Sequence, residues 1–232
     1  MKKTICFSTG NLRLWANTVS KRLDFMQKLD IDGVELSLDM RSVKTFSISR
    51  SKLSWLRGLD HISIHAPNGI GQLSLIEQKK FFSDLHSIYD NLEASNIIIH
   101  PTEFELPLPR HMHFCIENLV FRMHYDIPRL KRILKHHPTT GLCLDASHAY
   151  LWSSDRCSEL IKSFKKKIRQ IHLSGTYRRK THVSLQKTTG NFRISLTPLK
   201  GLDCPVVIES FFPKKDIKQV KDEIRLTRNL LY

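Results

Sequence analysis

Eight short apolar segments, each followed by polar or turn residues, constrain the fold of this chain more than any other feature of its sequence. Several of them are continuously apolar rather than alternating, which is typical of strands that are buried on both faces of a parallel sheet. They recur along the whole chain, at Thr4–Ser8, Gly33–Leu38, Ile62–His65, Ile97–His100, Phe114–Glu117, Leu142–Asp145, Ile168–Leu173 and Val206–Glu209.

Helical periodicity fills most of the intervals between these predicted strands. The segment after the fourth strand is short and proline-rich, so we expect its helix to be reduced or missing. Eight strands alternating with helices in 232 residues favour a closed parallel barrel over an open sheet. Without a linker or a shift in composition, residues 1–232 are predicted to form one domain, a single (β/α)8 TIM barrel of the α/β class with some helices reduced. The clearest predicted helices are Val19–Leu29, Ser74–Ala94, Ile127–Lys135, Asp155–Lys167 and Ile217–Leu231.

The composition narrows the class of protein further. Hydrophobic residues make up 41% and charged residues 25%, which suits a globular chain with a sizeable core. No run of about 20 apolar residues is present, so no membrane span or membrane partner is expected. The five cysteines are odd in number and lack CxxC spacing, which disfavours disulfides and an all-cysteine zinc site and favours a cytoplasmic location. No glycine-rich nucleotide-binding motif follows any strand.

The ends of six successive predicted strands carry an imidazole or a carboxylate directly after apolar residues. In a TIM barrel these ends converge on one mouth. Buried carboxylates need a counter-charge, and mixed imidazole and carboxylate donors suit Zn, Mn or Fe better than Mg or Ca. We therefore predict a divalent transition-metal site, with zinc favoured, over the alternative of hydrogen-bonded core or rim residues. Its residues would be His65, His100, Glu117, Asp145, His148, His172 and Glu209.

Two further residues are expected to lie just behind this mouth. Glu35 either joins the mouth as a supporting residue or pairs with a nearby Lys or Arg, and Asn118 follows Glu117 directly. The remaining histidines have no comparable placement, and we interpret them as surface or core residues: His61, His86, His111, His113, His124, His136 and His137.

A formal charge of +15 favours polyanionic partners, such as nucleic acid or phosphorylated ligands, although a solvated lysine-rich surface would explain it equally well. The basic residues cluster in three runs. Residues 165–167 and 214–215 are expected to face solvent. Arg178, Arg179 and Lys180 lie close to the predicted site, so we expect them to bind the phosphate of a substrate.

With its strand ends laid out, the chain resembles the xylose isomerase-like TIM-barrel superfamily, from Gly33-Val34-Glu35 to Ile208-Glu209. That superfamily includes endonuclease IV-type AP endonucleases (family 2), which act in DNA repair, and sugar phosphate isomerases and epimerases. Four motifs resemble endonuclease IV in particular. They are His65-Ala66-Pro67, His100-Pro101, Asp145-Ala146-Ser147-His148 followed by Asp155, and His182-Val183-Ser184-Leu185.

The endonuclease IV resemblance implies one to three metal ions. One ion would be held by His65, His100 and Glu117. A second would be held by Glu117, Asp145, His172 and Glu209, and a third by His148 and His182. This chain departs from the family pattern at Lys180, where the family has an aspartate, and residues 186–190 replace its glycine-rich turn. The stretch between His100 and Glu117, where loops would have to grip a DNA duplex, is also short. The third site and the grip on a DNA duplex are therefore the features that the resemblance supports least.

Two chemistries fit the predicted mouth. The first is hydrolysis of a phosphodiester by a metal-bound hydroxide, with nucleic acid, single-stranded or unusual in structure, as one substrate. The second is isomerisation or epimerisation of a sugar or sugar phosphate, with Glu117 and Glu209 as catalytic acid and base beside one metal ion. A metal-binding barrel without catalysis is the third alternative. The histidine content and the positive charge favour the hydrolase. The sequence leaves the oligomeric state open.

Overall fold

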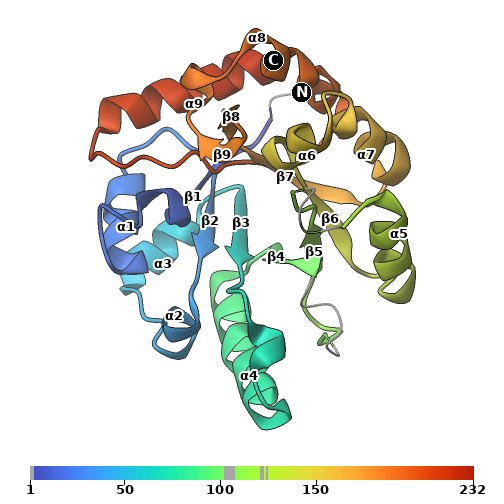
Figure 1. Ribbon diagram of the computed structural model, residues 1–232. Coiled ribbons are helices and arrows are strands. Elements are labelled where there is room, and N and C mark those ends of the chain that lie inside the picture. The colour runs from blue at the N-terminus through green and yellow to red at the C-terminus, as the bar shows by residue number, and fades with distance from the viewer. Residues whose placement is uncertain (1–2, 102–107, 121–122, 124) are drawn as a thin grey trace.

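Eight parallel strands close into a barrel in this computed structural model, which describes residues 3–101, 108–120, 123 and 125–232. The order around the barrel is β1-β10-β7-β6-β5-β4-β3-β2, with parallel pairing throughout (Figure 1). The predicted (β/α)8 barrel is confirmed. The strands are β1 (Ile5–Ser8), β2 (Gly33–Ser37), β3 (His61–His65), β4 (Asn96–Ile99), β5 (Phe114–Glu117), β6 (Gly141–Asp145), β7 (Ile168–Leu173) and β10 (Val206–Ile208).

Helices surround the barrel, and the five that the sequence predicts are confirmed to within a few residues at their ends. The described part of the segment between β4 and β5 contains no α-helix, and its residues 102–107 lie outside the described residues. No helix in the described part of the chain is long and apolar enough to cross a membrane. The helices are α1 (Val19–Met26), α2 (Met40–Lys44), α3 (Arg50–Arg57), α4 (Leu75–Leu92), α5 (Ile127–His136), α6 (Ala146–Trp152), α7 (Arg156–Phe164), α8 (Gly190–Ser195) and α9 (Ile217–Leu231).

A short hairpin projects from the barrel after β7, which the sequence did not predict. Its strands are β8 (Gly175–Tyr177) and β9 (Lys180–Val183), which pair antiparallel. Arg178 and Arg179 form the two-residue turn with φ of 48° and 63°. Left-handed conformations at both positions match the twist of a two-residue hairpin, but they cost residues other than glycine about 1–2 kcal/mol each.

Successive side chains along each strand point alternately outwards and into the barrel, so the strands contribute to two separate buried regions. Residues that point outwards, such as Val34, Ile64 and Leu144, pack against the helices in one large apolar core. Residues that point into the barrel include a separate small cluster of Ile98, Cys115 and Cys143. Side chains two residues apart share a face, so the inward series continues to the strand ends. The same alternation therefore directs Glu117, Asp145 and His172 towards the barrel axis.

A buried carboxylate on α9 fixes the two segments that follow β9 and β10. Glu223 is fully buried and accepts three hydrogen bonds. The donors are the Ser184 hydroxyl at 2.6 Å, the Leu185 backbone N–H at 2.6 Å and the Ser210 hydroxyl at 2.5 Å. Because these donors lie close in sequence to His182 and Glu209, the carboxylate stabilises one side of the barrel mouth.

Replacing Glu223 with alanine should leave three buried donors without an acceptor. We expect Glu223→Ala to lower the free energy of unfolding by roughly 2–4 kcal/mol, measured by urea denaturation. The matched control is Asp222→Ala, since Asp222 is partly exposed and pairs with Arg225 at 3.5 Å. The control should change stability by less than about 1 kcal/mol. Equal losses in the two variants would contradict this role for Glu223.

Candidate metal centre

The Glu117 carboxylate lies at the centre of the barrel mouth, with a side chain that is only 2% exposed. Its Oε2 atom is 3.2 Å from Nε2 of His65 and 3.2 Å from Nε2 of His100. Its Oε1 atom is 3.2 Å from Nδ1 of His148 and 3.7 Å from Nδ1 of His172. The two oxygens thus face different pairs of imidazoles, which come from different strand ends.

His172 is fully buried between two carboxylates. Its Nδ1 atom lies 3.2 Å from Oε2 of Glu209, and its Nε2 atom lies 2.9 Å from Oε2 of Glu35. The Gln170 amide donates a hydrogen bond to the same oxygen of Glu35, at 2.8 Å. A carboxylate behind an imidazole is the usual support of a histidine that binds metal, because it fixes the tautomer and the ring orientation. The structure therefore places Glu35 behind His172.

Asp145 combines a structural role with a free buried oxygen. Its Oδ1 atom caps α6, accepting the His148 backbone N–H at 2.6 Å and the Ser147 hydroxyl at 2.8 Å. Its Oδ2 atom is buried without a hydrogen-bond partner, 3.6 Å from Nδ1 of His148. Leaving a carboxylate oxygen buried and unsatisfied is costly, so this atom is suited to receive a cation.

Asn118 supports two of the predicted ligands through the backbone. Its side chain exchanges hydrogen bonds with the backbone of Asp145, as donor at 2.9 Å and as acceptor at 2.8 Å. Its carbonyl oxygen lies 3.0 Å from Nδ1 of His148. Asn118 therefore positions Asp145 and His148 without contacting the free oxygen of Asp145.

His182 enters the mouth from hairpin strand β9 with a left-handed backbone, φ 57°. Its backbone N–H donates to the Ser174 hydroxyl at 3.2 Å, and its carbonyl accepts from the Phe211 N–H at 2.8 Å. Its Nδ1 atom lies 3.9 Å from Oε2 of Glu209, and its ring packs edge-on against His148 at 5.4 Å. At 40% exposure, its imidazole is the most open in the mouth.

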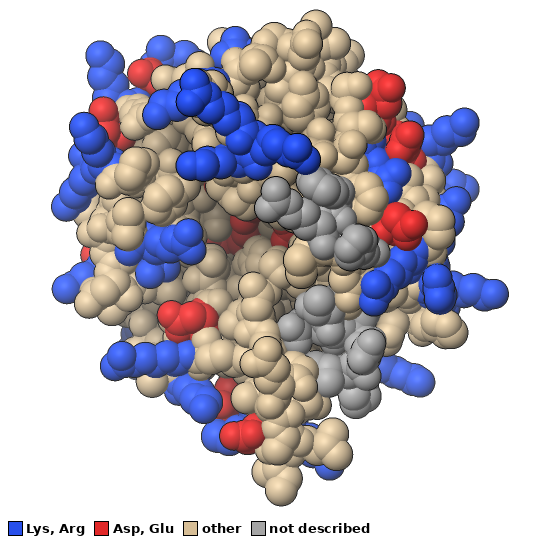
Figure 2. Space-filling view, viewed as in Figure 1, with Lys and Arg blue, Asp and Glu red and all other residues tan. Residues whose placement is uncertain are grey.

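Three overlapping groups in the described residues bring potential ligand atoms within 4.8 Å of one another. All eight predicted metal ligands belong to these groups except His100, which instead contacts Glu117 directly. Figure 2 shows the mouth as a hollow with acidic side chains at its floor and basic ones around it. The groups are His65, Glu117 and His172; Asp145, His148 and His182; and Glu117, Asp145, His172 and Glu209.

Protonated imidazoles balance the carboxylates when no cation is bound. Burial alone would lower the pKa of His65 and His148, but Glu117 raises the pKa of His65 to about 9, and Asp145 with Glu117 raises that of His148 to about 10. Burial would raise the pKa of Glu209, yet the charge of His172 lowers it to about 2. Burial is the largest cause of the raised pKa of Asp145, and it outweighs the opposing effect of the nearby His148 charge. The donor set and the free oxygen of Asp145 fit one or more divalent cations.

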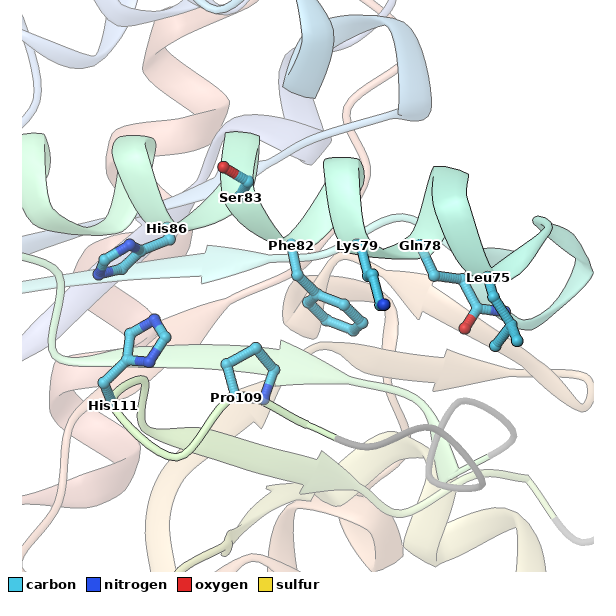
Figure 3. Close-up of a pocket in the computed structure, with 8 residues that line it drawn as sticks. All are labelled: Leu75, Gln78, Lys79, Phe82, Ser83, His86, Pro109 and His111. Carbon is cyan, nitrogen blue, oxygen red and sulfur yellow. The ribbon is translucent and has the colours of Figure 1, made fainter.

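The basic run lies at the rim rather than inside the mouth. Arg178 and Arg179 form the exposed tip of the hairpin, and Lys180 begins β9. Whether these residues bind phosphate stays a prediction. The remaining histidines lie outside the metal groups in the described residues, as expected, and His124 is outside the described residues. Two of them, His86 and His111, pack against each other at one end of an outer pocket beside α4 (Figure 3).

Sequence reasoning missed several residues that support the centre. Gln170 joins Glu35 to the buried His61, whose Nε2 lies 3.0 Å from the Gln170 side-chain oxygen. Ser147 links Asp145 to Ser174 through hydroxyl contacts of 2.8 and 3.0 Å. One signal was available for Gln170, which lies two residues before His172 and therefore shares its strand face. The serines carried no comparable signal.

No family model matches the chain, and no curated protein matches it in sequence. Solved structures match over almost the whole chain. Endonuclease IV from Thermus thermophilus has a TM-score of 0.69 at 16% identity, covering 98% of both chains. A 3-keto-D-glucoside 4-epimerase from E. coli has a TM-score of 0.69 at 12% identity, covering 98% of this chain and 99% of its own.

A third similar structure is a xylose isomerase domain protein from Planctomyces limnophilus. Its TM-score is 0.62 at 14% identity, covering 99% of this chain and 96% of that one. The structural neighbours are thus xylose isomerase-like TIM-barrel proteins, and the predicted resemblance is confirmed for the fold. At these identities, the likeness does not separate an endonuclease from an epimerase.

Cation binding to this centre should release protons. The pKa values of about 9 for His65 and 10 for His148 keep both rings protonated near pH 7 in the metal-free protein. A metal ligand must be deprotonated, so the apparent affinity for Zn²⁺ should rise between pH 6 and 9. Calorimetry at pH 7.5 in buffers of different ionisation enthalpy should show a net release of protons. A binding enthalpy that is independent of the buffer would contradict this assignment.

Proposed function

We propose that this chain is a metal-dependent phosphodiester hydrolase similar to endonuclease IV, with a nucleic acid as substrate. The observation that carries the proposal is the orientation of the Glu117 carboxylate. Its Oε2 faces His65 and His100, whereas its Oε1 faces His148 and His172. A carboxylate that presents one oxygen to each of two donor sets is suited to bridge two neighbouring cations.

Divalent cations bound there would supply the hydrolytic chemistry, by acidifying water and by neutralising the departing oxygen. The chain's own residues hold and orient that centre. Glu209, with its pKa of about 2, stays ionised throughout the working pH range and is suited to be a permanent anionic ligand. Glu35 holds the His172 ring from behind, and the α6 cap directs the free oxygen of Asp145 into the mouth.

Two features outside the ligand set also support a phosphodiester substrate. Arg178, Arg179 and Lys180 lie on the hairpin beside His182, where they can attract phosphates that flank the reacting one. Lys180, two residues before His182, also places a fixed positive charge near the donor group of Asp145, His148 and His182. We propose that this charge partly replaces an ion at that group.

Isomerisation or epimerisation of a sugar phosphate is the second candidate. It is favoured by the four-residue group of Glu117, Asp145, His172 and Glu209, which alone offers enough donors for one cation. Glu117 and Glu209 both approach Nδ1 of His172, at 3.7 and 3.2 Å. Two carboxylates on either side of one ion could move a proton between adjacent carbons of a substrate.

The metal content and an activity assay separate the two candidates. The protein reconstituted with Zn²⁺ or Mn²⁺ should contain two or more ions per chain and cleave abasic-site or single-stranded oligonucleotides. One ion per chain, together with turnover of a ketose or aldose phosphate, would establish the isomerase instead. Absence of cleavage with either metal would exclude the nuclease.

His148 provides the sharpest test by mutation. It belongs to the second donor set of Glu117 and is not a member of the four-residue group. His148→Ala should lower oligonucleotide cleavage by at least about 100-fold, the upper end of the loss seen when one supporting residue of a metal site is removed. The control is His86→Ala, on the outer surface of α4, which should cleave like the unmodified protein. An unimpaired His148→Ala variant would show that His148 holds no ion needed for cleavage, and would contradict its assignment as a metal ligand.

A further inference from the structure

Two adjoining depressions run along the outside of the mouth from His182 and meet at Arg13. The first has a volume of about 620 Å³ and is bounded by the β9 strand and the segment after β10. Four cationic side chains line it, and no carboxylate does so among the described residues. They are Arg13, Lys180, Lys187 and Lys214. Because His182 also belongs to the metal groups, this depression borders the candidate centre at that residue.

The second depression continues beyond Arg13 along α1 and has a volume of about 780 Å³. Its lining includes Lys21, Lys28 and Lys215, together with the aromatic residues Trp15 and Phe25. The one acidic residue in its lining is Asp24, whose carboxylate pairs with Lys52 at 2.8 Å. The excess charge of this depression is therefore positive as well.

Aromatic rings alternate with the cations along both depressions. The Arg13 guanidinium lies 5.2 Å from the centre of the Phe211 ring, and the Lys215 ammonium lies 4.4 Å from that of Phe25. Trp15 packs edge-on against Phe25 at 5.6 Å. Its indole N–H donates to the carbonyl of Phe212 at 2.8 Å, which holds the ring in place. These half-buried rings thus lie beside cationic side chains for which no ion pair is seen among the described residues.

Figure 2 shows basic side chains over the hairpin and towards α1, around a hollow whose floor is acidic. A polyanion is attracted by the basic side chains of the rim. It would therefore be held along the rim, with only its reacting phosphate above the metal centre. Sites for single-stranded nucleic acid generally combine a positively charged groove, which follows the sugar–phosphate backbone, with aromatic side chains on which bases stack.

We propose that these two depressions form one groove that binds a single-stranded polynucleotide on one side of the reacting phosphodiester. Arg13, Lys180 and Lys214 contact its phosphates, and a base stacks on Phe211. This inference rests on the proposed hydrolase function and specifies the substrate's form. The Lys214–Lys215 run faces solvent, as the sequence predicted, and the groove gives it a role in binding.

Binding can be tested with a fluorescent oligothymidylate that contains no abasic site, by anisotropy on the full-length protein. Arg13→Ala/Lys214→Ala should raise the Kd at least about 10-fold. Losing two phosphate contacts should also reduce the slope of log Kd against log salt by roughly 1.4, since each contact contributes about 0.7 on single strands. The control is Lys165→Ala/Lys166→Ala, which removes the same charge after α7, at the opposite end of the barrel. The control should keep the original slope.

Stacking is tested separately with Phe211→Leu, which keeps an apolar side chain but removes the aromatic face. Its Kd should rise at least about 5-fold, and its salt slope should not change because no phosphate contact is lost. Circular dichroism melting of every variant establishes that it is folded. Equal losses of affinity in Arg13→Ala/Lys214→Ala and in the control Lys165→Ala/Lys166→Ala would overturn the groove. Tighter binding of a duplex or of polyglutamate of equal length than of the single strand would also overturn it.

The groove and the proposed reaction fail independently. If oligothymidylate binding depends on Arg13 and Lys214 but no oligonucleotide is cleaved, the groove stands and the hydrolase does not. If cleavage occurs while both groove variants bind as the unmodified protein does, the hydrolase stands and the groove is wrong.

Discussion

A single buried carboxylate, that of Glu117, organises the mouth of this barrel. Four imidazoles lie within 3.7 Å of its two oxygens, and they come from β3, β7, the start of α6 and the residue after β4. A buried carboxylate destabilises the folded chain unless a positive charge or hydrogen bonds compensate it. In the metal-free chain, protons on the histidines compensate it, as the raised pKa values of His65 and His148 indicate.

The rest of the structure can be understood as support for that arrangement. Glu35 and Gln170 hold His172 from inside the barrel, and Asn118 ties together the ends of β5 and β6. Asp145 caps α6 with one oxygen and leaves the other free. Glu223 accepts hydrogen bonds from Ser184 and Ser210, and so holds the segments next to His182 and Glu209 in the sequence. Each of these supports uses a buried polar group that is costly to leave unsatisfied.

The sequence was sufficient to predict the barrel and the convergence of its polar strand ends. Strand periodicity determined which residues share a face, so Glu117, Asp145 and His172 could be placed at one mouth before their contacts were known. Contacts between distant segments were harder to predict. Nothing local indicates that Glu35 meets His172 across 137 residues, or that Glu223 accepts from Ser184 and Ser210.

Turn geometry was the other limit on prediction. The hairpin of β8 and β9 turns at Arg178-Arg179, although glycine or asparagine is the usual signal for such a turn. The left-handed backbone of His182 is retained by hydrogen bonds to Ser174 and Phe211, which only the folded chain provides. Left-handed residues that are not glycine concentrate at functional sites, which agrees with the position of His182 between the donor groups and the basic groove.

The most direct test of the account is the position of bound metal in crystals grown with Zn²⁺, located by anomalous diffraction at the zinc absorption edge. We predict at least two peaks on either side of the Glu117 carboxylate, one beside His65 and His100 and the other beside Asp145, His172 and Glu209. A single peak away from Glu117, or zinc bound only at surface histidines such as His86 and His111, would contradict it.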